Sequence, residues 1–86
     1  MMHIKITEEI GQSVIEFLNG QIAVSGFDSL EVELKVRINR LSVGGRISVL
    51  TWVKSQLTWP KSNIDFDEND KIWCVEIIDS LLDKMR

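Results

Sequence analysis

The sequence predicts a small α+β domain, an antiparallel β-meander of about three to four strands with two C-terminal helices packed on one of its faces. Two observations lead to this prediction. Residues 30–38 alternate between apolar and charged side chains, which is typical of a half-buried strand. From residue 43 onward, apolar residues recur every three or four positions, which indicates helices. The 86 residues suffice for one domain and one core, so we assign residues 1–86 to a single α+β domain.

The clearest strand is predicted at residues 30–38, "LEVELKVRI". One face of this strand is apolar and consists of Leu30, Val32, Leu34, Val36 and Ile38. The other face is charged and consists of Glu31, Glu33, Lys35 and Arg37. A sheet with one buried and one solvated face produces this pattern.

The N-terminal part allows two interpretations. Residues 7–20 can form a capped helix that ends at Asn-Gly. They can also form a β-hairpin in which Asn19 and Gly20 make a type I′ turn, Phe17 faces Ile22 and Ile15 faces Val24. We favour the hairpin, leave the helix open for residues 8–18, and expect "HIKI" (3–6) to add a further strand.

Two helices are predicted in the C-terminal half. The first covers about residues 46–58 and stops before Pro60, with a strand at 47–53 as the competing interpretation. The second covers about residues 67–85. Its apolar stripe consists of Cys74, Val75, Ile78, Leu81, Leu82 and Met85.

The acidic stretch 65–76, "DFDENDKIWCVE", resembles an EF-hand calcium loop in its ligand positions. Asp65, Asp67, Asn69 and Glu76 fill the first, third, fifth and twelfth positions of that loop, and calcium prefers such oxygen ligands. The sixth position should be glycine and is Asp70. No incoming helix is predicted before Asp65, and no second loop exists to pair with this one.

The same acids also fit the start of a helix, and this is the interpretation we favour. Asp65 and Glu68 have the spacing of a capping box. Acidic side chains in a first turn interact favourably with the helix dipole. We therefore expect no metal site here and keep a calcium-binding module as the second alternative function.

The usual catalytic residues are scarce. The chain has one histidine, His3, one cysteine, Cys74, and no tyrosine. Cys74 falls on the apolar stripe of the last helix, where a buried thiol acts as a small hydrophobe. Zinc would need clustered cysteines and histidines. We expect no catalytic activity and no cofactor.

Charges are segregated along the chain. No acid occurs between Leu34 and Ile64, and this basic segment suggests the first alternative function, nucleic-acid binding through residues 35–61 with Trp52 and Trp59 as stacking platforms. Its cations are Lys35, Arg37, Arg40, Arg46, Lys54 and Lys61. The net charge of −3 and the spread of these cations disfavour that function.

The tryptophans provide the strongest functional signal. Trp52, Trp59 and Trp73 all fall outside the helical stripes that should face the sheet. Exposed tryptophans are typical of binding hot spots. The open alternative is that the helices pack on one another and bury the rings.

We expect a small non-catalytic protein-binding module that acts by occupying the surface of a partner protein, as an inhibitor, an immunity or antitoxin-like protein or an accessory subunit. A homodimer is one form that its interface can take. The tryptophans would fill pockets, and acidic residues would meet a basic partner. These acids are Asp65, Asp67, Glu68, Asp70, Glu76, Asp79 and Asp83.

The location that we expect is the cytoplasm. A single cysteine excludes an intrachain disulfide and fits a reducing compartment. The N-terminus lacks the basic start and apolar run of a secretory signal. No apolar stretch approaches the roughly 20 residues that span a bilayer, so no membrane association is expected.

Overall fold

The computed structural model describes residues 4–22, 24, 26–59 and 66–85, and within these residues it contains four α-helices and no β-strand. The helices are α1 (Ile4–Gln21), α2 (Phe27–Ile38), α3 (Val43–Thr58) and α4 (Glu68–Met85). The predicted α+β fold is therefore wrong: the β-meander is absent from the described residues, and its segments are helical.

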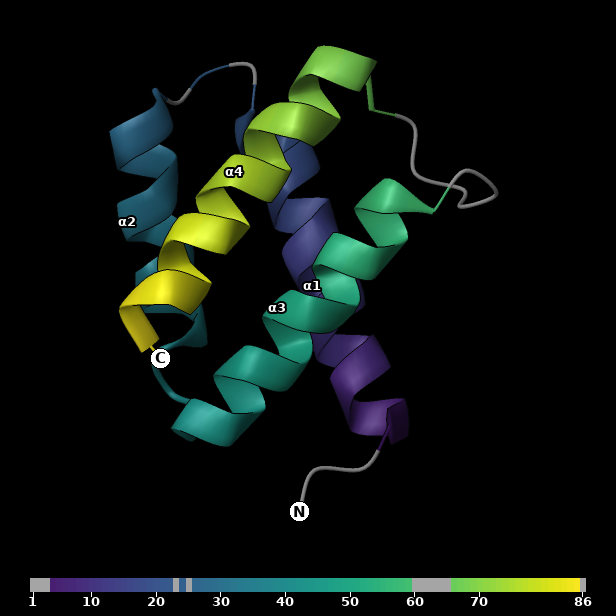
Figure 1. Cartoon of the computed structure of the whole chain (residues 1–86), viewed down its shortest axis with the longest axis vertical. Coiled ribbons are helices and arrows are strands. Elements are labelled where there is room, and N and C mark those ends of the chain that lie inside the picture. The colour runs from purple at the N-terminus through teal and green to yellow at the C-terminus, as the bar shows by residue number, and fades with distance from the viewer. Residues whose placement is uncertain (1–3, 23, 25, 60–65, 86) are drawn as a thin grey trace.

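The four helices pack around one core. Figure 1 shows α3 and α4 toward the viewer, α1 behind them and α2 along one side. Helix α3 packs on both α1 and α4, and α2 packs on α4 and more sparsely on α1. All fully buried side chains in the described part are apolar, and they come from all four helices.

Helix α2 shows why the strand prediction at residues 30–38 failed. In a helix, about 100° separates successive residues, so Leu30, Leu34 and Ile38 fall within one narrow stripe. These three residues are buried. A strictly alternating sequence thus also contains an apolar i, i+4 series. Asp28 in the first turn and Lys35 and Arg37 in the last turn match the helix dipole as well.

Helix α1 replaces the predicted hairpin. A type I′ turn needs positive φ at both central residues, and neither Asn19 nor Gly20 has it. Val14 and Leu18 are buried one helical turn apart, which the helical interpretation requires. The strand expected at "HIKI" is also wrong in its described part, because α1 begins at Ile4.

The helices predicted in the C-terminal half are confirmed. Helix α3 begins after Ser42, whose Oγ accepts a hydrogen bond of 3.1 Å from the Gly45 backbone N–H, and it ends one residue before Trp59. Helix α4 has Glu68 and Asp70 in its first turn, as the dipole argument predicts. The capping role predicted for Asp65 lies outside the described residues.

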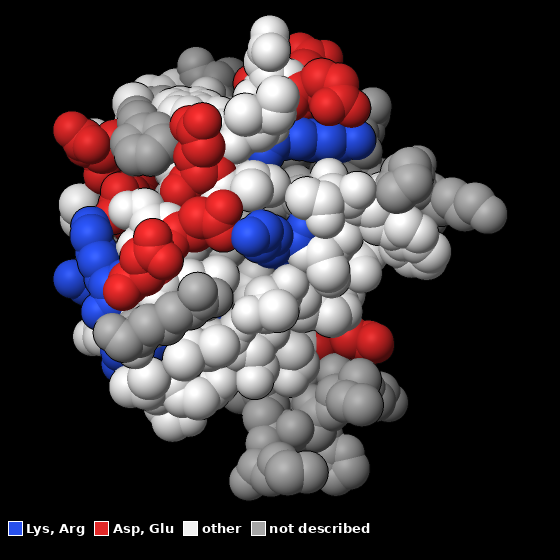
Figure 2. Space-filling view, viewed as in Figure 1, with Lys and Arg blue, Asp and Glu red and all other residues white. Residues whose placement is uncertain are grey.

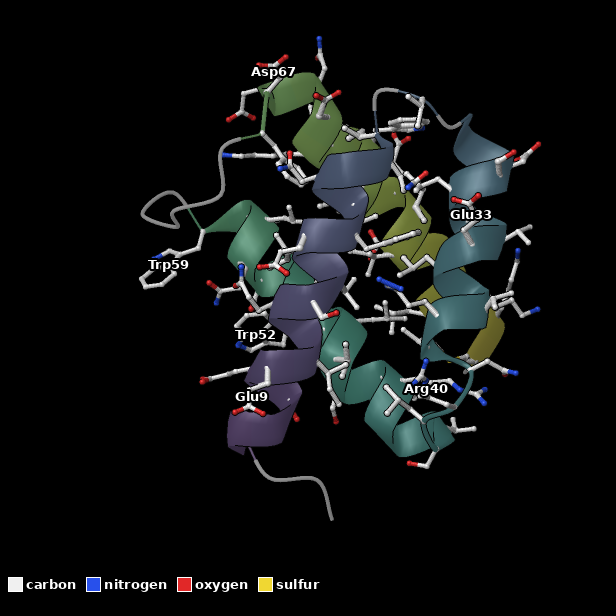
Figure 3. All side chains as sticks on the ribbon, turned by 180° about the vertical axis from the view of Figure 1, so that it is seen from behind. Glu9, Glu33, Arg40, Trp52, Trp59 and Asp67 are labelled. Carbon is white, nitrogen blue, oxygen red and sulfur yellow. The ribbon has the colours of Figure 1, made fainter. Side chains whose placement is uncertain are left out.

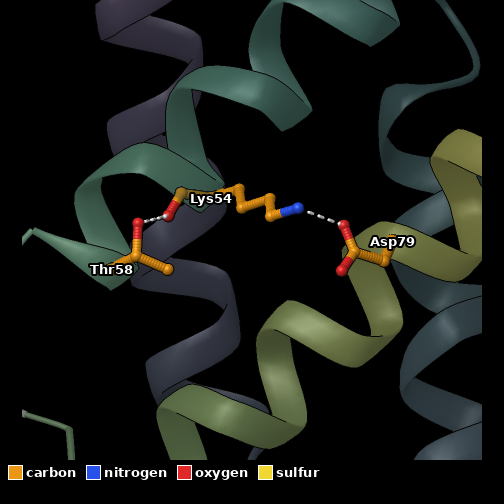
Figure 4. A network of polar contacts seen from close by, with 3 residues as sticks. All are labelled: Lys54, Thr58 and Asp79. Carbon is orange, nitrogen blue, oxygen red and sulfur yellow. Dashed lines mark hydrogen bonds and ion pairs between the residues drawn. The ribbon is translucent and has the colours of Figure 1, made fainter.

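Polar contacts join the helices at the surface of the core. Lys54 of α3 donates a 2.6 Å hydrogen bond to the carboxylate of Asp79 of α4 (Figure 4). Glu31 of α2 accepts hydrogen bonds from Ser80 and Lys84 of α4. These contacts tie α4 to α3 and to α2 at the edge of the core.

Candidate interaction site

A hollow lies where the end of α3 meets the first turns of α4. Seven residues line it: Leu57, Thr58, Trp59, Glu68, Lys71, Ile72 and Val75. Trp59 is 53% exposed and Ile72 is 55% exposed, which is unusual for side chains of this size. Figure 3 shows Trp59 at the end of α3, directed away from the helices. We call Trp59, Ile72 and the hollow beside them the Trp59 site.

The fold explains why Trp59 is exposed. It is the C-cap residue of α3, and its backbone is extended rather than helical. The chain therefore leaves the helix at this residue, one position after the last helical turn. Leu57, two residues earlier, is buried and ends the core stripe of α3.

Trp52 is not a free binding residue. Its ring is partly buried, packs against the core and covers Gly11 of α1 (Figure 3). A Cβ atom built on Gly11 would lie only 2.2 Å from Trp52 Cε3. The binding role predicted for Trp52 assumed that α3 packs on a sheet, whereas α3 packs on α1 and the Trp52 ring lies in that contact.

Trp73 is partly buried as well and packs against the core. It precedes Cys74, the first fully buried residue of α4. Of the three tryptophans, Trp59 is therefore the most exposed, and Trp52 and Trp73 are only partly so.

The acidic residues predicted to bind a partner are spread along the length of α4 and do not form one cluster. Glu68, Glu76, Asp79 and Asp83 recur at helical spacing, so they share one side of α4 with Ile72. Figure 2 shows acidic side chains gathered over α4, which faces the viewer.

These acids differ in what they contact. Asp79 is engaged by Lys54. Asp67 directly precedes the first helical residue of α4, and its backbone carbonyl accepts a 2.9 Å hydrogen bond from the Lys71 N–H. Asp70 is partly exposed in the first turn. Asp65 lies outside the described residues.

The calcium loop that was kept as the second alternative is not a loop over most of its length. Its positions from Glu68 to Glu76 are helical, whereas the template needs a turn at its sixth residue. Among the described residues, no group of three or more histidine, cysteine or acidic side chains is arranged to hold a metal ion.

The basic segment is spread around the molecule. Lys54 is paired with Asp79, Arg37 stacks over the ring of Phe17 at 4.6 Å, and Arg46 donates a 2.8 Å hydrogen bond to the Asn39 carbonyl. Arg40 lies on the side of the molecule away from Trp59 (Figure 3). The cations therefore do not form one face together with the exposed tryptophan, and Lys61 lies outside the described residues.

Cys74 lies on the buried side of α4 and is part of the core. Burial, with a smaller effect from the negative charge of Asp70, raises the pKa of its thiol to about 11. A thiol in this state is a poor nucleophile. His3, the only imidazole considered as its partner, lies outside the described residues.

Two features were missed at the level of sequence. Gly11 is the position at which α1 comes into close contact with the Trp52 ring, and nothing in the sequence around Gly11 indicates this contact. Val32 and Val36 are 60% and 70% exposed on α2. Their i, i+4 spacing is visible in the sequence, but the strand prediction placed both valines on its buried face.

No protein-family model, curated protein or solved structure matches this chain. None of the helices in the described ranges is both long and apolar enough to cross a membrane.

Proposed function

We propose that the protein is a small non-catalytic binding module that acts by occupying the surface of a partner protein through the Trp59 site. The observation that supports this proposal is the exposure of Trp59 and Ile72 beside one hollow. Tryptophans at the centre of an interface contribute a large share of the binding free energy. The inhibitors, immunity or antitoxin-like proteins and accessory subunits considered above all belong to this class.

The partner surface that suits the Trp59 site is apolar at its centre and basic along one side. Ile72 and Val75 continue the apolar surface from the hollow onto α4. Glu76 and Asp83 are exposed further along the same helix, where they can meet lysine or arginine side chains. Asp79 contributes less to this attraction, because Lys54 already neutralises it.

Affinity capture from a lysate of the native host tests the proposal. The baits are the wild-type protein, Trp59→Ala and Val43→Ala. Val43 is 51% exposed at the start of α3, so its replacement is a matched control for the loss of an exposed apolar side chain. We expect a basic partner that the wild type and the control retain and that Trp59→Ala loses.

Equal retention of every captured protein by all three baits would reject the Trp59 site. Nucleic-acid binding, the alternative function, predicts instead that a nuclease treatment releases the captured material. It also predicts a mobility shift with nucleic acid at low salt, where electrostatic binding is strongest.

A further inference from the structure

A pocket of about 200 Å³ lies where the C-terminal ends of α2 and α4 meet the first turn of α3. Figure 1 shows these three helix ends together near the C-terminus of the chain, whereas the Trp59 site lies at the opposite ends of α3 and α4. We call this hollow the Arg46 pocket. Its lining residues are Lys35, Ile38, Asn39, Arg46, Leu81, Lys84 and Met85.

The lining of the Arg46 pocket combines two kinds of side chain. Ile38 and Leu81 are buried core residues, and Met85 is partly buried and packs against the core. No acidic side chain of the described residues lines the pocket. The charged side chains that do line it are all cations: Lys35, Arg46 and Lys84. An apolar wall beside cations suits a ligand that has an anionic group and an apolar part.

Arg46 is the cation whose surroundings compensate it least. It is partly buried, and its charge has no acidic partner among the described residues. Its Nη2 donates a 2.8 Å hydrogen bond to the Asn39 carbonyl, which is neutral. Its Nε lies beneath the surface and has no hydrogen-bond partner in the described part of the chain. Withdrawing a charged group from water costs free energy unless an opposite charge compensates it, so the guanidinium favours an anion in the pocket that it lines.

The neighbouring charges determine how much negative charge the ligand should carry. Lys84 is already neutralised by Glu31, to which it donates a hydrogen bond. Lys35 takes part in no salt bridge among the described residues. The C-terminal ends of α2 and α4 each contribute roughly half a negative charge, which leaves about one positive charge from Lys35 and Arg46. This excess matches a singly charged carboxylate better than a doubly charged phosphate.

We infer that the Arg46 pocket binds a small amphipathic monoanion, a carboxylate on a short apolar chain. The carboxylate pairs with Arg46 and Lys35, and the planar guanidinium is the cation that matches carboxylate geometry best. The apolar chain lies against Ile38, Leu81 and Met85. Pockets for drug-sized ligands measure roughly 300–1,000 Å³, so a pocket of about 200 Å³ takes a chain of only a few carbons.

Hexanoate is the probe that tests this inference, in a titration of isotope-labelled protein followed by NMR. We expect saturable shifts of the backbone amides around the pocket, at 38–39, 46 and 81–85. The dissociation constant should be on the order of 1 mM, because so small a ligand makes few contacts. Affinity should rise by up to ~fourfold for each methylene added from acetate through butyrate to hexanoate. Hexanol, which lacks the charge, and inorganic phosphate, which lacks the chain, should each bind at least ~tenfold more weakly.

Replacement of the cations tests where the carboxylate binds. Arg46→Gln should weaken hexanoate binding at least ~tenfold. The matched control is Arg40→Gln, which removes an exposed arginine that does not line the pocket and should keep the affinity within about twofold of the wild type. Arg46→Gln also loses the hydrogen bond to Asn39, so circular dichroism must show that it folds. Lys35→Gln changes an exposed residue, leaves the fold intact and should weaken hexanoate binding about threefold.

Met85→Ser tests the apolar part of the site. It should reduce the gain in affinity from acetate to hexanoate and leave the affinity for acetate unchanged. The inference is independent of the proposed function, so Trp59→Ala should bind hexanoate like the wild type.

Several results would overturn the inference. Hexanoate that causes no saturable shifts at concentrations far above the expected dissociation constant would do so. Hexanol or phosphate that binds as tightly as hexanoate would show a merely apolar or a merely anionic site. Equal hexanoate affinity of the wild type, Arg46→Gln and Lys35→Gln would remove both cations from the site. Loss of binding in Arg40→Gln alone would place the carboxylate outside the Arg46 pocket.

Discussion

The indole ring of Trp52 lies directly on Gly11, where α3 packs against α1. A Cβ atom on Gly11 would lie 2.2 Å from Trp52 Cε3 and 2.5 Å from Cζ3, far inside van der Waals contact. Gly11 is buried, and the absence of a side chain at this position is what allows the ring to cover the helix. The contact sets how closely the two helices approach.

Gly11→Ala should destabilise the protein. Alanine favours a helix over glycine by about 1 kcal/mol, but overpacking a tight contact costs about 1–3 kcal/mol. Both the ring and α1 are held by other core contacts, so we expect the overpacking to dominate. Urea unfolding followed by circular dichroism measures the resulting loss of the free energy of unfolding.

Two controls isolate the contact. Gly20 is in the same helix, and a Cβ atom added to it would have no other atom within 4 Å, so Gly20→Ala should be neutral or stabilising by up to about 1 kcal/mol. In a Trp52→Leu background, Gly11→Ala should lose its penalty. An unchanged penalty in that background would show that the ring is not its cause.

The contact between Glu31 and α4 predicts a pH dependence of stability. The hydrogen bond from Lys84 is the main cause that lowers the pKa of the Glu31 carboxyl below its ordinary value of 4.5, and Ser80 adds to the effect. A carboxyl whose pKa is lower in the folded state stabilises that state at pH values above the unfolded pKa. This stabilisation is lost as the pH falls from the unfolded value through the folded one.

We therefore expect the free energy of unfolding to fall below about pH 4.5, with a shallower fall in Glu31→Gln, which cannot ionise. Thermal melts of both proteins between neutral and acidic pH measure the difference. The matched control is Glu33→Gln, an exposed acid on the same helix. The interpretation fails if Glu31→Gln and the wild type show parallel curves.

The buried thiol of Cys74 predicts slow chemical modification. With a pKa of about 11, about one thiol in a thousand is ionised at pH 8, and the core covers the sulfur. We expect a thiol reagent to react only when the protein unfolds, at a rate that rises with urea. Fast labelling in native buffer, independent of urea, would place Cys74 at the surface.

The helices α3 and α4 could be predicted because their apolar residues recur at a helical period and because Pro60 and the acids before Lys71 mark helix ends, although residues 47–53 of α3 also allowed a strand. Residues 30–38 could not be assigned in this way. Their alternation satisfies a strand with one buried face and equally a helix with two apolar faces. Only the packing of Leu30 and Leu34 against α4 and the core decides between them.

The candidate site was predictable in part for the same reason. The helical period of the apolar residues ends at Leu57, and Trp59 comes after it. The position of Trp59 past the last turn of α3 could therefore be predicted from the sequence. The environment of Trp52 depends on which element packs against α3. The sequence analysis assumed a sheet there, whereas the structure has α1. The exposure of Val36 depends likewise on the rotation of α2, which places Leu30 and Leu34 in the core.

The most direct measurement is the dissociation constant of the captured partner for wild-type protein, Trp59→Ala and Val43→Ala, by isothermal titration calorimetry. If the Trp59 site binds this partner, Trp59→Ala should weaken binding at least ~30-fold, the effect of a hot-spot residue, while Val43→Ala stays within about twofold of the wild type. Equal dissociation constants for all three proteins would contradict the role of Trp59 and move the binding surface elsewhere.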